Sequence, residues 1–213
     1  MVTSAAPVEP APPRPAPAAE TDATERRMDS LYVRLAVGMG FPFGPDVADV
    51  YDGRDGEALQ FSGVSFAMDW MGGVAVMPGL MLGLGAASDA VLGGTVREPD
   101  QTERDLENSL YYAVIGGFAD FYTTPPAGLH FQTLLGLARL SRSDDLGENT
   151  AVGFGAVLGI GYELAVGRRW NLGALARMAI SPLGMDAVDG DEPSPTFFEP
   201  SLLLTATFRP EAK

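Results

Sequence analysis

The chain contains no cysteine and only one histidine, His130, among its 213 residues. Without cysteine it has no disulfide framework, no thiol nucleophile and no cysteine-ligated zinc or iron–sulfur centre. A single histidine also excludes a histidine-rich metal site. We therefore expect no cofactor.

Basic residues are few. Lysine and arginine together number 14, against 28 aspartates and glutamates, which gives a formal net charge of -14. Nucleic-acid-binding proteins contact phosphates through clustered basic side chains, whereas the 14 here are scattered along the chain. The sequence therefore predicts no nucleic-acid partner.

Long apolar runs are also missing, because Gly, Asp, Arg or Ser interrupts every apolar stretch before it reaches the roughly 20 residues of a membrane-spanning helix. A helical membrane protein is thereby excluded. A transmembrane β-barrel is not excluded, since its strands alternate lipid-facing apolar residues with small or polar residues that face the lumen.

Residues 1–28 are rich in Ala, Pro and Glu and contain no aromatic residue. Such a segment has too little apolar surface to offset the entropy of ordering it, so we predict a disordered tail. It lacks the apolar stretch of a signal peptide, and Arg26 and Arg27 lie at the wrong end for one. We expect the export signal to have been removed or to lie upstream of Met1. Residues 29–213 are expected to form one domain.

From Leu31 onward, the chain shows the period-two alternation of β-strands. In residues 64–76 one face is apolar and the other is small or polar, and residues 152–166 repeat the split. The alternation predicts eight strands, over residues 31–40, 62–76, 80–88, 109–121, 129–140, 150–166, 170–181 and 196–208. Most of them are long enough for a tilted strand to cross a bilayer.

The predicted connections alternate between short and long. Short ones lie at 77–79, 123–128 and 167–169, and long ones at 41–61, 89–108, 141–149 and 182–195. This pattern is typical of an all-β, eight-stranded antiparallel up-and-down transmembrane β-barrel. An even strand number places both termini on the short-turn rim, which we expect to be periplasmic, and the long loops outside the cell. These loops carry 18 of the 28 acidic residues.

The two faces of the strands suggest different surroundings. Aromatic residues near the ends of the outward face are candidates for an interfacial girdle: Phe61, Trp70, Tyr112, Phe118, Tyr122, Tyr162, Trp170, Phe198 and Phe208. Inward positions are rich in glycine, which leaves room in a narrow lumen: Gly38, Gly40, Gly73, Gly83, Gly85, Gly117, Gly136, Gly153, Gly155, Gly159, Gly161 and Gly173. The alternative is a soluble β-sandwich with these aromatic residues in its core.

Four charged residues have inward parity: Arg34, Asp69, Glu163 and Arg177. Their charges balance, and counting rows from the short-turn rim places Arg34 with Glu163 and Asp69 with Arg177. We expect them to form a buried polar network that plugs the lumen, because a lone buried charge is costly. In the alternative, water fills the lumen and screens the four charges separately.

In strand periodicity and turn asymmetry, residues 31–208 resemble the small outer-membrane β-barrels of Gram-negative bacteria, the OmpA-type transmembrane domains and their relatives. The closing segment 196–208 is similar to their C-terminal assembly signal and ends on Phe208, although residues 209–213 follow it. The resemblance implies an outer-membrane location in contact with lipid and lipopolysaccharide. It also implies that the barrel assembly machinery is a partner during biogenesis.

Some barrels of this kind modify lipid A with a His-x-Ser pair, but here Gln132 stands where the serine would be. The glycines of residues 153–159 have the even spacing of one strand face and are not followed by the strand-to-helix unit of a dinucleotide loop. We therefore expect no catalytic residues, and we interpret His130 as a hydrogen-bonding residue of the lumen beside Gln132.

The acids of the last long loop, Asp186, Asp189, Asp191 and Glu192, are candidate calcium ligands, since calcium prefers several carboxylate and carbonyl oxygens. They lack the spacing of a complete EF-hand loop. Divalent cations bridging such loops to lipopolysaccharide phosphates are a looser form of this hypothesis.

The sequence thus predicts a non-enzymatic, porin-like outer-membrane barrel with a structural or surface-interaction role. One alternative is a narrow channel, or a binder or transporter of small hydrophobic molecules. Another is a soluble lipocalin-like barrel, whose apolar face would point inward to hold a ligand.

Overall fold

The computed structural model describes residues 31–44, 60–97, 103–105, 109–125, 127–144, 147–184 and 196–209. Within these ranges the strands are β1 (Leu31–Gly40), β2 (Phe43–Gly44), β3 (Gln60–Met77), β4 (Leu80–Arg97), β5 (Glu103–Asp105), β6 (Ser109–Tyr122), β7 (Gly128–Asp144), β8 (Gly147–Ala165), β9 (Trp170–Gly184) and β10 (Thr196–Phe208). No helix in the described parts is long and apolar enough to cross a membrane. The predicted tail 1–28 and most of the predicted long loops lie outside the described residues.

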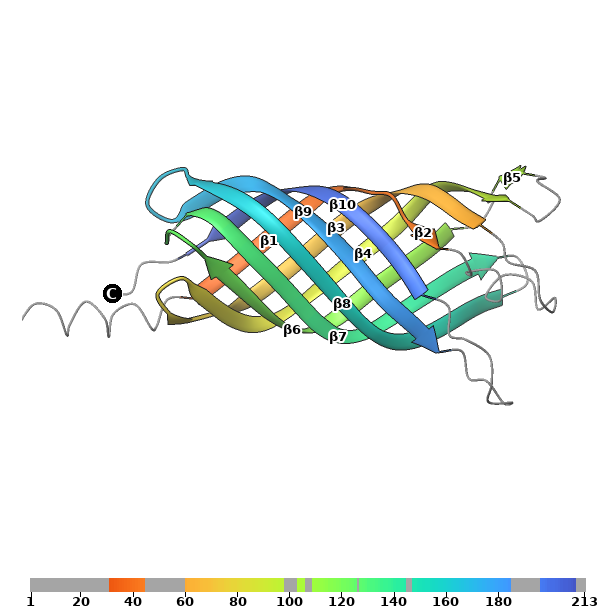
Figure 1. The fold of residues 1–213 in the computed structure, drawn as a ribbon, viewed down its shortest axis with the longest axis horizontal. Coiled ribbons are helices and arrows are strands. Elements are labelled where there is room, and N and C mark those ends of the chain that lie inside the picture. The colour runs from red at the N-terminus through yellow and green to blue at the C-terminus, as the bar shows by residue number, and fades with distance from the viewer. Residues whose placement is uncertain are drawn as a thin grey trace, which may run out of the picture.

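The eight long strands form a closed antiparallel barrel (Figure 1). Neighbours in sequence pair with one another from β3 to β4, then through β6, β7, β8 and β9 to β10. Strand β1 closes the barrel because it pairs with β3 on one side and β10 on the other. The short β2 pairs with β3 and β10, and β5 extends the edge of β4. The predicted all-β, eight-stranded architecture is thus confirmed.

One rim of the barrel is built from three tight turns, and the start of β1 and the end of β10 lie at the same rim (Figure 1). Each turn contains a glycine with positive φ: Gly79, Gly128 and Gly167. In the first turn, Pro78 precedes Gly79, the residue order of a type II turn, in which the second central residue needs this conformation. We call this end the short-turn rim.

At the opposite rim the strands extend further than the apolar alternation predicted. Strand β7 continues to Asp144 and β8 begins at Gly147, so the predicted long loop 141–149 is mostly a strand-paired hairpin. Strand β4 likewise continues to Arg97, past the predicted end at residue 88. The prediction was wrong for β7 and β8 because the residues beyond the apolar belt are mostly polar, which ends the hydrophobic pattern while backbone pairing continues. In β4 the apolar sequence is interrupted by Ser88 and Asp89 and then resumes.

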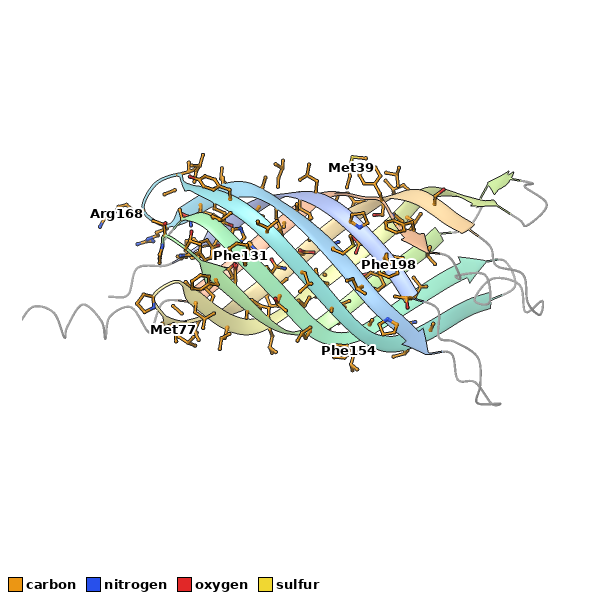
Figure 2. All side chains as sticks on the ribbon, viewed as in Figure 1. Met39, Met77, Phe131, Phe154, Arg168 and Phe198 are labelled. Carbon is orange, nitrogen blue, oxygen red and sulfur yellow. The ribbon has the colours of Figure 1, made fainter. Side chains whose placement is uncertain are left out.

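The outward positions of the wall are apolar, and the inward positions fill the lumen. Met39, Met77 and Phe154 extend away from the wall in Figure 2, and each is about half exposed. Of the predicted girdle, Trp70, Tyr162 and Trp170 are exposed, Phe198 and Phe208 are partly exposed, and the side chain of Phe61 is not described.

The predicted facing of β6 was wrong. Tyr112, Phe118 and Tyr122 are buried in the lumen, whereas Tyr111, Ile115 and Phe121 face outward. Gly117 accordingly faces outward as well, and Gly116 takes the inward position. Both faces of this strand are largely apolar, so alternation of hydrophobicity alone does not distinguish them.

Candidate functional site: the filled barrel lumen

The lumen holds every aspartate and glutamate whose side chain the structure describes, and all five are fully buried: Asp69, Asp89, Asp120, Glu163 and Glu199. The two arginines buried with them are Arg34 and Arg177. Because an unpaired charge is costly in such an interior, the contacts of these seven groups determine what the lumen can do.

Near the short-turn rim, a cluster of polar side chains surrounds Asp120 of β6; we call Tyr32, Arg34, Asp120, His130 and Gln132 the rim cluster. Arg34 Nη1 donates to Asp120 Oδ2 at 2.8 Å, and the Tyr32 hydroxyl donates to the same oxygen at 2.7 Å. His130 Nδ1 lies 2.9 Å from Asp120 Oδ1. The second Arg34 nitrogen donates to Gln132 Oε1. One oxygen of Asp120 thus accepts hydrogen bonds from the Arg34 guanidinium and the Tyr32 hydroxyl, and the other oxygen faces the His130 imidazole.

Glu163 is held by neutral groups at the same end of the lumen. The Tyr122 and Thr207 hydroxyls donate to its two carboxylate oxygens at 2.8 and 2.6 Å. The Asn171 amide is 3.4 Å away. Its hydrogen bonds thus come from neutral groups. Those on β6 and β10 connect these two strands to β8 across the lumen, and Asn171 lies on the neighbouring strand β9.

Farther from this rim, one guanidinium is surrounded by three carboxylates; we call Asp69, Asp89, Arg177 and Glu199 the central cluster. The two terminal nitrogens of Arg177 donate to Asp69 and Asp89 respectively. Glu199 lies next to Asp89 and accepts from the Ser65 hydroxyl. Asp69, Asp89 and Glu199 each keep one oxygen without a protein partner. The cluster therefore has more carboxylates than countercharges.

Small wall residues make room for these polar side chains. Gly161 lies opposite His130 in the β7–β8 register, and a Cβ there would collide with the imidazole. Gly40 is placed in the same way against the Glu199 carboxylate and the Ser65 hydroxyl. Glycine in a strand interior commonly marks such a close approach, and here it sets the width of the lumen.

Buried apolar side chains also face the interior. Met71, Leu134, Val157, Leu175 and Leu203 are each at most 1% exposed. Leu175 and Leu203 form a cross-strand pair next to the pair of Arg177 and Ser201. The described lumen thus contains buried apolar side chains beside its polar clusters.

No family model matches the sequence, and no curated protein matches it. Among solved structures, Neisserial surface protein A is similar with a TM-score of 0.54 and 13% identity, over 82% of this chain and 95% of that protein. The attachment invasion locus protein Ail of Yersinia pestis (13% identity, 84% and 98% coverage) and OprG of Pseudomonas aeruginosa (10% identity, 89% and 100% coverage) give TM-scores of 0.45 and 0.44. The chain has the fold of a small outer-membrane β-barrel. This likeness concerns the fold alone.

Within this small outer-membrane barrel fold, the four charged residues singled out from the sequence all lie in the lumen. Arg177 and Asp69 are brought together, as their rows suggested. Arg34 and Glu163 are not paired with each other, because Arg34 binds Asp120 and Glu163 binds hydroxyl groups. The loop acids Asp186, Asp189, Asp191 and Glu192 lie outside the described residues. Among described residues, no group of three His, Asp or Glu side chains is arranged to hold a metal ion.

Sequence reasoning missed three lumen acids for three different reasons. The predicted strand ends at residue 88, so the sequence predicts a loop at Asp89. The wrong facing predicted for β6 leaves Asp120 out of the lumen, although it is the one charged residue of that strand and a charge is expected to face inward. Glu199 shares inward parity with Thr205 and Thr207, so the alternation of β10 could have revealed it.

Proposed function

We propose that this protein is a non-enzymatic β-barrel of a Gram-negative outer membrane, with a lumen sealed by its own side chains and a structural or surface-interaction role. The observation that carries this proposal is the distribution of side chains across the barrel wall: large apolar side chains cover the outside, and all the described acids are buried inside. In water, such an outer surface would be a continuous apolar patch far larger than monomeric soluble proteins expose. A lipid environment removes this cost.

The same observation disfavours the soluble lipocalin-like alternative. A barrel that carries a hydrophobic ligand needs an apolar interior with free space, whereas this interior contains two arginines and five acids and is packed with side chains. Its cross-lumen contacts also favour a sealed barrel. Arg34 of β1 joins β6 and β7, and Arg177 of β9 joins β3 and β4.

The contacts of His130 support a non-enzymatic role. Its Nδ1 faces Asp120, its ring stacks on Tyr122 at a centroid distance of 4.8 Å, and its Nε2 abuts Gly161 in the wall. A hydrolytic dyad needs a hydroxyl nucleophile next to the free imidazole nitrogen, and Nε2 has no hydrogen-bond partner among the described residues. We assign His130 a structural role in the rim cluster.

The proposal includes an orientation, with the short-turn rim and the 1–28 tail in the periplasm and the acidic long loops outside the cell. There the loop acids would meet the divalent cations that bridge lipopolysaccharide phosphates, and they would provide the surface for an extracellular partner. The similarity of the fold to a protein named for its surface position is in keeping with such a role. Strand β10 would present the end of the chain to the barrel assembly machinery.

A narrow cation channel is the second candidate. The unpartnered oxygens of Asp69, Asp89 and Glu199 support it, because these buried acids could bind a passing cation or water. The surplus of carboxylates over arginines in the central cluster would favour cations over anions.

Refolding into vesicles and planar bilayers tests both candidates. For a sealed outer-membrane barrel we expect a folded band in unheated gel samples that shifts on heating, and no stepwise conductance in planar bilayers. Solubility without detergent would contradict the membrane barrel. Conductance that rises when Arg177 is replaced by alanine would contradict neither the fold nor the location, but it would identify the central cluster as the seal. Conductance of the unmodified protein would establish the channel instead.

A further inference from the structure

We propose that the turn between β8 and β9, together with the end of β10, forms a docking site for the headgroup of an anionic glycerophospholipid. The site consists of Arg168, Arg169 and Arg209 with the rings of Trp170 and Phe208; we call these five residues the arginine turn. The inference rests on the proposed membrane location and adds a specific lipid contact to it.

Among the described residues, Arg168, Arg169 and Arg209 are the charged side chains that reach the surface at the short-turn rim. The other two turns, 77–79 and 123–127, contain no charged residue. Arg168 and Arg169 are exposed, and Arg168 extends beyond the end of the barrel in Figure 2.

Backbone pairing holds the three arginines together. The Arg209 backbone N–H donates to the Arg169 carbonyl at 2.9 Å, which joins the residue after β10 to the turn before β9. The Arg209 guanidinium lies over the Tyr122 ring, 4.3 Å from its centroid, and its Nε and Nη2 are buried there. The arginine turn therefore gathers three positive charges at one point of the rim, and the side chains of Arg168 and Arg169 are the exposed ones.

An aromatic pair lies directly beside these arginines on the membrane side. Trp170 pairs with Phe208 in the β9–β10 register, with ring centroids 4.9 Å apart, and the indole is half exposed. Beyond them, Leu164 and Leu172 continue an exposed apolar surface down the wall. Aromatic rings at the headgroup level with guanidinium groups just outside match an amphiphile with a phosphate head and acyl chains.

The charge of the site selects the lipid class. Guanidinium groups bind phosphate through paired hydrogen bonds, and several of them together favour a headgroup with net negative charge over a zwitterionic one. A basic residue near an anionic lipid surface strengthens binding by about fivefold. We therefore expect phosphatidylglycerol to displace phosphatidylcholine from the wall beside Trp170.

The chain supplies its own probe, because it has only two tryptophans. In the full-length Trp70→Phe variant, Trp170 is the single tryptophan and lies within the site. This variant is refolded into phosphatidylcholine vesicles in which an increasing share of the lipid is replaced by brominated phosphatidylcholine or brominated phosphatidylglycerol. Bromine quenches tryptophan at short range, so the two quenching curves give the relative affinity of the two lipids beside Trp170.

We expect phosphatidylglycerol to be preferred several-fold and the preference to fall as salt screens the charges. Arg168→Gln with Arg169→Gln, in the Trp70→Phe background, should reduce it to near one. The control Arg139→Gln removes an exposed arginine from β7 and should leave the preference unchanged. The salt titration of the Trp70→Phe protein needs no arginine variant, so it still decides the question if the double variant fails to fold.

The outcomes separate the two proposals. Equal quenching by both lipids, a preference insensitive to salt, or an equal loss in Arg139→Gln would overturn the docking site while leaving the membrane barrel intact. Loss of the preference in inorganic phosphate, compared with chloride at the same ionic strength, would show that the site takes free phosphate and would also overturn it. If brominated phosphatidylcholine does not quench Trp170 at all, the protein has not inserted and the proposed function fails first.

Discussion

Two buried aspartates, Asp120 and Asp89, differ in the number of positive charges near them, and this number decides whether each carboxylate stabilises or destabilises the barrel. Asp120 is the ion-pair partner of Arg34 and also accepts from Tyr32. Asp89 instead shares Arg177 with Asp69 and lies beside a third carboxylate, Glu199. Loss of the first leaves a buried cation unpaired, whereas loss of the second relieves repulsion between acids.

We therefore expect Asp120→Asn to lower the free energy of unfolding by about 3 to 5 kcal/mol, the usual cost of breaking a buried ion pair. Asp89→Asn keeps its size and leaves Arg177 paired with Asp69, so we expect the stability to remain within about 1 kcal/mol of the unmodified protein. Urea unfolding of the refolded barrels in vesicles, followed by the heat-sensitive gel shift, measures both. Equal destabilisation by the two substitutions would mean that water screens the lumen charges individually.

At the level of single strands, the apolar alternation predicted the existence of all eight long strands and the facing of most of them. It succeeded in β3 and β8, where one face is small or polar, because only one orientation then places the apolar face toward lipid. It failed in β6, where Tyr111, Ile115 and Phe121 oppose Tyr112, Val114 and Phe118 on the other face. The strand ends were missed for a separate reason, since hydrogen-bonded pairing does not require apolar residues.

The revised facing of β6 can be tested at Ile115, which is 67% exposed on the outer wall near the middle of the strand. Ile115→Arg places a charge toward lipid and should destabilise the inserted barrel by about 2 to 4 kcal/mol. Ile115→Ala removes apolar surface without adding charge and serves as the size control. The yield of folded protein and the urea midpoint in vesicles should fall much more for arginine than for alanine. Similar values for the two would support the facing originally expected, in which residue 115 points into the lumen.

For the molecule as a whole, the sequence predicted the closed barrel and the inward position of four charged residues, but it did not predict most of their partners. Which residues meet across a barrel lumen depends on how far each strand is shifted relative to its neighbours. The alternation within a single strand carries no information about this shift. The row count pairs Arg177 with Asp69, which the structure confirms, but it pairs Arg34 with Glu163. The expected facing of β6, with Phe118 outward, leaves Asp120 out of the lumen, so the true partner of Arg34 is absent from the predicted network. One error of facing on β6 thus changed the predicted network of the rim cluster.

The last prediction concerns the orientation of the whole molecule. Because the number of long strands is even, the start of β1 and the end of β10 both lie at the short-turn rim, which the proposed function places in the periplasm. Because the chain has no cysteine, a single introduced thiol has no background: Asp189→Cys probes the last long loop, and Arg168→Cys probes the arginine turn. On intact cells a membrane-impermeant maleimide should label the first and not the second, and permeabilising the outer membrane should make both reactive. Labelling of Arg168→Cys alone on intact cells would show that the orientation is opposite to the proposed one, with the acidic loops, rather than the arginines, in the periplasm.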